Sequence, residues 1–285
     1  MGVILDYRNK INFILLNYLI KIKDNKLRSI IDYTLEGGKR VRPSILYELC
    51  NINNINKGYR DNIIVGIELL HNASLILDDM PNMDNDRYRR NKLCVHIKYG
   101  NRTAMIIANY LFFEALKMFA LIGINNSINN SKLIRVMNYV NLQNKNISLG
   151  QYYDLFPLLR NNIEHSNDFN SDLYRLNLKT IPLFVLPFVI PVIVRDNDIT
   201  DDIRDYENMA IYFSYMFQIC DDFEDINTDL DDSNHIKIFG ENETLKLFNS
   251  SRSNFIILLK KHKLFNNFFK GLINLIDNKL SNKIS

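Results

Sequence analysis

The sequence predicts an all-α fold, and three observations lead to this prediction. Apolar residues recur at steps of three or four almost everywhere, which is the spacing of one helix face. Strict alternation of apolar and polar residues over six or more positions is hard to find. The 285 residues include only 10 Gly and 6 Pro, too few for a turn-rich β-fold. No period typical of repeat proteins recurs, and none of the polar stretches resembles an interdomain linker, so we expect one domain, residues 1–285.

Two long helices are expected in the first half of the chain. One apolar stripe joins Ile63, Ile67, Leu70, Ser74 and Leu77, and a second joins Ala104, Ile107, Leu111, Ala115 and Met118. Stretches rich in Asn or Gly, near 51–58, 121–131, 161–170 and 227–235, separate the helical segments. In the second half, Thr200 before Asp201 and Asp202 is typical of a capped helix start.

Composition excludes several classes of function. Lys and Arg number 35 and Asp and Glu number 32, and the resulting charge of +3 does not predict a nucleic-acid surface. Three Cys without a CxxC pair argue against a disulfide framework or a zinc site, so we expect a reducing, cytoplasmic location. The longest apolar run, 181–194, is too short to cross a bilayer and is broken by Pro182, Pro187 and Pro191. We therefore expect buried core there and no transmembrane segment.

Two of the four Asp-Asp pairs end apolar runs. Asp78 and Asp79 follow the run 73–77, and Asp221 and Asp222 follow the run 212–220. Adjacent carboxylates repel each other and lose hydration beside apolar walls, so a bound cation is the expected remedy. The pairs at 201–202 and 231–232 are expected at a helix start and in solvent.

The spacing of nearby carboxylates predicts metal ligands. Asp221 and Asp225 are four residues apart and would share one helical face. Asp84 follows Asp78 by six residues, and Pro81 between them should bend the chain back. Ligation by oxygen alone favours Mg²⁺ over Zn²⁺ and keeps coordination positions for substrate phosphates. Ordinary acidic helix ends in an Asp-rich chain remain the alternative interpretation.

Basic residues gather near the first acidic cluster. The segment Gly37 to Pro43 places two glycines before three cations, a backbone that can approach a phosphate closely. Arg87, Arg89 and Arg90 follow the acidic cluster, and Lys179-Thr180 adds a cation and a hydroxyl before an apolar run. Interleaved acidic and basic groups suit a metal-bridged diphosphate, whereas each run alone is typical of a solvated face.

Together these motifs resemble those of the polyprenyl synthases, the trans-prenyltransferases that make farnesyl, geranylgeranyl and longer diphosphates. Gly37 to Pro43 is similar to the family's GGKRxRP box, and Asp78 to Asp84, followed by Arg89 and Arg90, is similar to the long first aspartate-rich motif. The remaining landmarks match in order at Gly150-Gln151, Lys179-Thr180 and Phe217 to Asp225. The wording HNASLILDDMPNMDN is most similar to that of bacterial geranylgeranyl diphosphate synthases.

The resemblance implies an isoprenoid synthase fold, a single helical bundle around a prenyl tunnel. It implies a homodimer that condenses isopentenyl diphosphate with dimethylallyl, geranyl or farnesyl diphosphate, using about three Mg²⁺ ions. The allylic C–O bond would ionise, and the alkene of isopentenyl diphosphate would attack the resulting cation. The stripe from Ala104 to Met118 is the expected dimer face.

The resemblance also implies roles for individual residues. Metal ligands would be Asp78, Asp79, Asp84, Asp221 and Asp225. Substrate diphosphates would be bound by Lys39, Arg42, His71, Arg89, Arg90, Lys179, Thr180 and Gln218. The expected catalytic residues are Asp78, Asp84, Asp221 and Lys179.

Product length is predicted from small and large residues along the tunnel. Ala73 and Ser74 are small, so the tunnel should admit a chain longer than farnesyl, and Tyr110, Phe112 and Phe113 are large enough to close it further down. The prediction is geranylgeranyl diphosphate as main product, with farnesyl diphosphate next. The alternative reading of these aromatic residues is ordinary core.

Two departures from the family pattern keep other functions open. Asn91 to Cys94 stands where the family usually has Gly-x-Pro-Thr, and residues 226–234 contain no Lys where the family carries a lysine-bearing loop. A noncatalytic regulatory subunit of a prenyl synthase is one alternative. A terpene cyclase of the same fold is the other, but it would not need Lys39, Arg42 and His71.

Overall fold

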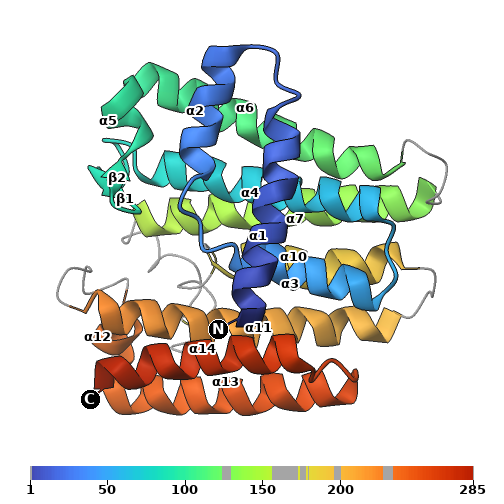
Figure 1. The fold of residues 1–285 in the computed structure, drawn as a ribbon. Coiled ribbons are helices and arrows are strands. Elements are labelled where there is room, and N and C mark those ends of the chain that lie inside the picture. Colours follow the sequence, from blue (N-terminus) through green and yellow to red (C-terminus); the bar gives the residue numbers. More distant parts are fainter. Residues whose placement is uncertain are drawn as a thin grey trace. The chain divides into compact units, whose positions relative to one another are not determined.

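The computed structural model describes residues 2–123, 130–155, 173, 178, 180–195, 200–226 and 234–284 (Figure 1). Helices dominate these residues, which confirms the all-α prediction. The chain divides into two compact units. The N-terminal unit comprises Leu5–Val140 and Ile193–Asp196, and the C-terminal unit comprises Met1–Ile4, Asn141–Val192 and Asn197–Ser285.

The N-terminal unit is built around one helix pair. Its helices are α1 (Gly2–Leu19, apart from the first residues), α2 (Asn25–Leu35), α3 (Val41–Ile52), α4 (Lys57–Asp78), α5 (Val95–Tyr99), α6 (Asn101–Ala120), the 3-10 turn η1 (Leu121–Gly123) and the first part of α7 (Asn130–Leu155). Helices α4 and α6 pack closely at Gly66, where a Cβ would lie 3.1 Å from the Phe119 ring and 3.3 Å from the Ala115 carbonyl oxygen.

The two predicted apolar stripes form most of this packing. On α4, Ile63 and Ile67 are fully buried, whereas Leu77 at the end of the stripe is 43% exposed. On α6, every member of the stripe from Ala104 to Met118 is buried. The expectation that this stripe pairs two copies of the chain is therefore wrong, because it already covers the core of its own unit.

One short hairpin interrupts the helical pattern and was not predicted. Strands β1 (Tyr88–Arg89) and β2 (Lys92–Leu93) pair antiparallel, with Arg89 opposite Lys92. Arg90 and Asn91 join them with φ of 53° and 60°. Positive φ at both central residues is the pattern of a type I′ turn, and Asn adopts it more readily than most residues other than Gly. Asn91 thus adopts a conformation that the family's Gly favours.

The C-terminal unit packs aromatic side chains between long helices. It contains the rest of α7, then α10 (Ile181–Val194), α11 (Thr200–Glu224), α12 (His235–Phe239), α13 (Glu241–Lys261) and α14 (Asn267–Ile284). Helices α13 and α14 run alongside α11 (Figure 1). Phe184, Phe188, Phe213, Phe255 and Phe269 are fully buried, with neighbouring ring centroids 5.1 to 6.4 Å apart. Asp201 and Asp202 lie in the first turn of α11, and the cap predicted before them stays a prediction.

Helix α10 corrects the expectation that prolines break the run 181–194. The helix continues through Pro187 and Pro191, and all 14 of its residues are buried. Each internal proline removes one helical hydrogen bond and would ordinarily cost about 3 kcal/mol. Burial on every side offsets this cost, because each apolar side chain loses its contact with water.

Helix α6 and η1 together are long and apolar enough to cross a membrane by length and composition. However, 39% of the apolar window is buried inside the N-terminal unit. A core helix of a globular protein satisfies the same criterion, so this segment alone does not indicate a membrane span.

Candidate functional site

The first carboxylate cluster lies in the N-terminal unit, where α4 ends. The Asp84 N–H donates to the Asp78 carbonyl oxygen at 2.9 Å, and the Met80 carbonyl accepts from Met83 and Asn85. The chain therefore folds back after Pro81, as predicted. Asp78 is half-buried and Asp84 is exposed. The fold-back brings the backbone of the two residues together although six positions separate them.

Asp79 differs from its neighbour. It is 3% exposed and accepts a hydrogen bond from Arg89 Nε at 2.5 Å. Cys94, where the family usually has Thr, is a neighbour of Asp79. Burial raises the pKa of the Asp79 carboxyl, and the nearby guanidinium only partly offsets this. These contacts make Asp79 a group that fixes Arg89, and its role as a metal ligand stays a prediction.

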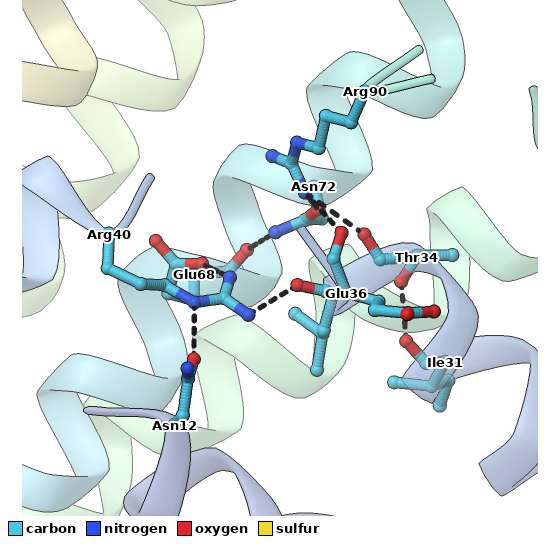
Figure 2. Close-up of polar contacts among 9 residues, drawn as sticks. Asn12, Ile31, Thr34, Glu36, Arg40, Glu68, Asn72 and Arg90 are labelled. Atoms are coloured by element: carbon cyan, nitrogen blue, oxygen red, sulfur yellow. Dashed lines mark hydrogen bonds and ion pairs between the residues drawn. The ribbon is translucent and has the colours of Figure 1, made fainter. Parts of the chain in front are cut away.

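Arg40, in the Gly37 to Pro43 segment, is buried and makes contacts within the protein. Arg40 is 6% exposed, forms an ion pair with Glu68, donates to the Leu35 carbonyl and donates from Nε to Asn12 at 3.0 Å (Figure 2). Gly38 leaves room for it, because a Cβ at residue 38 would lie 2.5 Å from Arg40 Nη1. Arg40 therefore holds the segment against α4 and the end of α2.

Arg90 reaches the same region from the hairpin. Its Nη1 donates to the carbonyls of Thr34 and Glu36 at 3.3 and 3.4 Å and to Asn72 Oδ1 at 3.3 Å (Figure 2). Its guanidinium thus joins the C-terminal end of α2 to α4. These contacts fix Arg90 at the edge of the basic segment.

His71 lies among these arginines, about two turns before the end of α4. Burial and then the charges of Arg42, Arg90, Arg89 and Arg40 lower its pKa well below the ordinary value. Its Nδ1 is buried, and no described residue hydrogen-bonds it. The structure therefore brings together Arg42, His71 and Arg90, three of the predicted diphosphate binders. A cluster of cations with a vacant imidazole nitrogen favours an anion.

Lys39 lies beside this basic cluster in sequence and is exposed. Lys179, a predicted catalytic and binding residue, falls outside the described residues.

The second carboxylate cluster lies in the C-terminal unit, at the end of α11. The Asp225 N–H donates to the Asp221 carbonyl oxygen at 3.0 Å, which confirms that the two residues are one helical turn apart. The Asp221 carboxylate forms an ion pair with Lys279 of α14, and the Lys279 Nζ lies 3.1 Å from Glu224. We did not predict Lys279. Its only sequence signal is its place between the apolar residues Ile276 and Leu280 of an amphipathic helix.

Asp222 holds the neighbouring groups in place. It is 1% exposed, accepts from Gln218 Nε2 at 2.8 Å and from the His235 backbone N–H at 2.9 Å, and hydrogen-bonds the His235 ring. Thr180 Oγ1 hydrogen-bonds Gln218 Oε1 at 3.1 Å. The two predicted binding residues Thr180 and Gln218 are therefore brought together, and Asp222 fixes the orientation of the Gln218 amide.

The donor sets fit a hard cation that completes its coordination with substrate. Among the described residues, no group of three or more His, Cys, Asp or Glu could hold a metal alone. Asp78 with Asp84, and Asp221 with Asp225, supply oxygen donors only. Mg²⁺ is usually held by one or two carboxylates together with substrate phosphates and water.

A cavity of about 440 Å³ lies elsewhere in the N-terminal unit. Its lining includes Tyr18, Asp61, Tyr110 and Glu114. Asp61 precedes Asp78 by 17 residues on α4, a separation of roughly 25 Å along a helix. This cavity therefore does not adjoin the first carboxylate cluster.

The residues predicted to set product length are only partly in suitable positions. Ala73 is 1% exposed, and the Ser74 hydroxyl donates to the His71 carbonyl at 2.9 Å. Tyr110 lines the cavity described above. Phe113 is 67% exposed on α6, so its predicted place at the end of an internal tunnel is corrected.

Comparisons with known proteins agree on one family. The family model described as "Polyprenyl synthetase" matches residues 24–245. A farnesyl diphosphate synthase of Buchnera aphidicola is 30% identical over 234 residues, which cover 78% of this chain and 79% of that protein. A trans-prenyltransferase of African swine fever virus is 30% identical over 273 residues, covering 91% and 80% respectively.

Solved structures show the same fold. A geranyltransferase from Legionella pneumophila has a TM-score of 0.83 at 22% identity and covers 100% of this chain and 98% of its own. A geranyltranstransferase from Thermotoga maritima has a TM-score of 0.81 at 23% identity, covering 96% and 99%. The isoprenoid synthase fold predicted from the sequence is confirmed.

Proposed function

Because the chain belongs to the polyprenyl synthetase family, we propose that it condenses isopentenyl diphosphate with allylic diphosphates in a Mg²⁺-dependent reaction. The observation that carries this proposal is the first cluster, where Asp78 and Asp84 are folded together in the same unit as the His71 and arginine group. Oxygen donors for a metal and cations for a diphosphate are thus supplied by one end of α4 and its neighbours.

Each group has a distinct task in this reaction. Arg42, His71 and Arg90 bind the diphosphate of isopentenyl diphosphate, with Lys39 as an exposed additional cation. Asp78, Asp84, Asp221 and Asp225 would hold Mg²⁺, which when bound makes the allylic diphosphate a better leaving group. Thr180 and Gln218 of the C-terminal unit would orient a diphosphate through hydroxyl and amide. In the N-terminal unit, Asp79 fixes Arg89 for contact with a diphosphate. Binding and orientation then account for most of the catalysis.

The main product proposed is geranylgeranyl diphosphate, because the buried position 73 carries only a methyl group. Farnesyl diphosphate is the second candidate, since relatives about 30% identical are named farnesyl diphosphate synthases. In the proposed tunnel, an aromatic ring at position 73 would block a longer chain. Ala73→Phe should therefore shorten the main product by at least one isoprene unit.

The test is turnover with isopentenyl diphosphate, Mg²⁺ and each of three primers, namely dimethylallyl, geranyl and farnesyl diphosphate, followed by product sizing. Asp78→Asn is the catalytic control and should lower the rate by about 10² or more, as loss of a charge-stabilising group does. No turnover by the wild-type chain with any primer would favour the regulatory-subunit alternative. An unchanged product length in Ala73→Phe would contradict the tunnel argument.

A homodimer is part of the proposal, with a different face of α6 from the one first expected. Met105, Ile106 and Phe113 are 53%, 64% and 67% exposed on α6, opposite the buried stripe. Large apolar side chains at helical spacing on an exposed face are typical of an interface between subunits.

A further inference from the structure

The cation that contacts the second carboxylate cluster comes from the C-terminal helix. The Lys279 side chain is 18% exposed, and its ammonium group forms ion pairs with Asp221 and Glu224. It also lies 5.6 Å from the centroid of the Phe217 ring, a favourable position for a cation. Three groups of α11 therefore fix the ammonium, within two turns of that helix.

The backbone that carries Lys279 is fixed as well. Arg252 of α13 donates Nε and Nη2 to the Asp277 carboxylate, with contacts of 2.8 Å. The Cys220 thiol of α11 donates to the Ile276 carbonyl at 3.6 Å. Since α14 is tied to both α11 and α13 next to Lys279, the lysine reaches Asp221 from a defined position.

Lys279 and a divalent cation require the same carboxylate. Asp221, Glu224 and Asp225 place three negative charges within about one turn of α11, and an ammonium group relieves their repulsion. A metal that binds Asp221 shares the carboxylate with this ammonium or displaces it, and in either case it faces a nearby positive charge. A diphosphate arriving with the metal removes that repulsion, because it gives the ammonium an anionic partner.

We infer that Lys279 is a positioning residue that holds Asp221 until a divalent cation arrives with a diphosphate, so that the cluster binds metal weakly without substrate. This inference rests on the proposed function, which supplies the metal and the diphosphate. Lys279 also supplies a cation to a cluster that is followed by residues 226–234, which contain no lysine.

The experiment measures Mn²⁺ binding by electron paramagnetic resonance, first without and then with inorganic diphosphate. The full-length wild-type chain is compared with Lys279→Gln, Lys279→Arg, Lys283→Gln and the double variant Lys279→Gln/Asp221→Asn. Lys283 is the matched control, because it is an exposed lysine one turn further along α14. Circular dichroism of each variant establishes that it is folded.

Without diphosphate, Lys279→Gln should bind Mn²⁺ roughly three- to tenfold more tightly than wild type, the range expected for losing one partly buried ion pair. Lys279→Arg and Lys283→Gln should remain within about twofold of wild type. The gain should vanish in the double variant, because it depends on the Asp221 carboxylate. Diphosphate should tighten Mn²⁺ binding more in wild type than in Lys279→Gln.

Unchanged or weaker Mn²⁺ binding in Lys279→Gln would overturn the inference, as would a gain that persists without the Asp221 carboxylate. Absence of Mn²⁺ binding in every variant would also overturn it, since Lys279 would then exclude nothing. Turnover of the wild-type chain is measured separately and tests the proposed function. An active enzyme with unaltered metal binding in Lys279→Gln refutes the inference alone, whereas an inactive chain refutes the proposed function.

Discussion

A buried ion pair lies beneath the glycine-containing segment of the N-terminal unit. The side chains of Arg40 and Glu68 are 5% and 3% exposed, and Arg40 also donates to Leu35 and Asn12. Such a pair contributes little net stability relative to apolar residues, but loss of one partner leaves the other charge buried. Replacing only Arg40 or only Glu68 should therefore destabilise the protein more than replacing both with apolar residues.

Arg40→Met should lower the free energy of unfolding by about 3 to 5 kcal/mol, because Glu68 would be left buried without its partner. Urea denaturation followed by circular dichroism measures this. Lys10→Met is the control, since Lys10 and Asp6 form an exposed pair in the same unit and its loss should change stability by less than about 1 kcal/mol. Equal effects of the two substitutions would contradict the structural role given to Arg40.

His71 makes the stability of the chain depend on pH. Its pKa is lowered in the folded protein, first by burial and then by surrounding arginines, so it stays neutral there while the unfolded chain takes up a proton below about pH 6.5. The unfolded state then binds more protons, and stability falls as pH falls.

Wild type should lose up to about 1.4 kcal/mol of stability per pH unit below pH 6.5 on account of this residue, and His71→Gln should lack that contribution. The measurement is urea unfolding of both proteins between pH 5 and pH 8. Parallel curves for wild type and His71→Gln across this range would show that His71 is not the group responsible.

The residue types predicted the chemistry that each cluster can perform. They did not predict which contacts each residue of a cluster makes. Asp78 and Asp79 are adjacent and identical in sequence, yet Asp78 is half-buried whereas Asp79 is buried and accepts a hydrogen bond from Arg89. Arg40 and Arg42 have the same side chain, and only Arg40 pairs with Glu68. Lys279 contacts Asp221, although 58 positions separate the two residues in the sequence. Which way a side chain points, and what long-range packing brings to it, is set by tertiary structure and has no local sequence signal.

Among the elements, the turn between α2 and α3 depends most directly on its glycines. Gly37 has φ of +79°, and a Cβ at Gly38 would lie 2.5 Å from Arg40 Nη1 and 3.0 Å from its Cζ. Arg40 cannot move aside without leaving Glu68 and the Leu35 carbonyl. Glycine is therefore favoured at position 37 because of its backbone conformation and at position 38 because a Cβ would clash with Arg40.

Gly38→Ala should lower the free energy of unfolding by about 1 to 3 kcal/mol, the usual cost of forcing an additional group into a packed site. Thermal unfolding measures the effect. Gly271→Ala is the matched control within helix α14, where nothing lies within 4 Å of the new Cβ, and it should stabilise the chain by about 0.5 to 1 kcal/mol. A neutral Gly38→Ala would mean that the guanidinium has room to shift.

The long helices were predictable from the sequence. The proline-containing helix α10 and the β-hairpin were not. The stripes of α4 and α6 follow from the spacing of apolar residues alone. Helix α10 survives two internal prolines because surrounding helices bury it completely, and this support lies outside the segment itself. The hairpin at Arg90 and Asn91 depends on two positive φ angles at residues that also occur in ordinary helices and loops.

At the scale of the whole molecule, the proposed homodimer would use the exposed face of α6. The buried stripe of the same helix packs within its own unit, so on α6 a second copy would contact the face with Met105, Ile106 and Phe113. Burying these side chains in a dimer would remove apolar area from water, and each large side chain contributes roughly 1.5 to 3 kcal/mol when fully buried.

The double variant Ile106→Lys/Phe113→Asp should shift the protein from dimer to monomer at micromolar concentration, as measured by sedimentation velocity. Ile257→Lys is the control, because Ile257 is 60% exposed on α13 in the other unit and should leave the dimer intact. A dimer that withstands the α6 substitutions, or dissociates equally with Ile257→Lys, would place the interface elsewhere.

The contacts of Arg90 have a kinetic consequence. Its backbone is set in a left-handed turn and its guanidinium is held by two carbonyls and an amide oxygen, so a diphosphate meets a cation that does not need to reorganise. Capture should then be limited by diffusion and by the long-range field of the arginines rather than by side-chain rearrangement. The association rate of inorganic diphosphate should accordingly decrease steadily with ionic strength, while viscosity slows it in proportion.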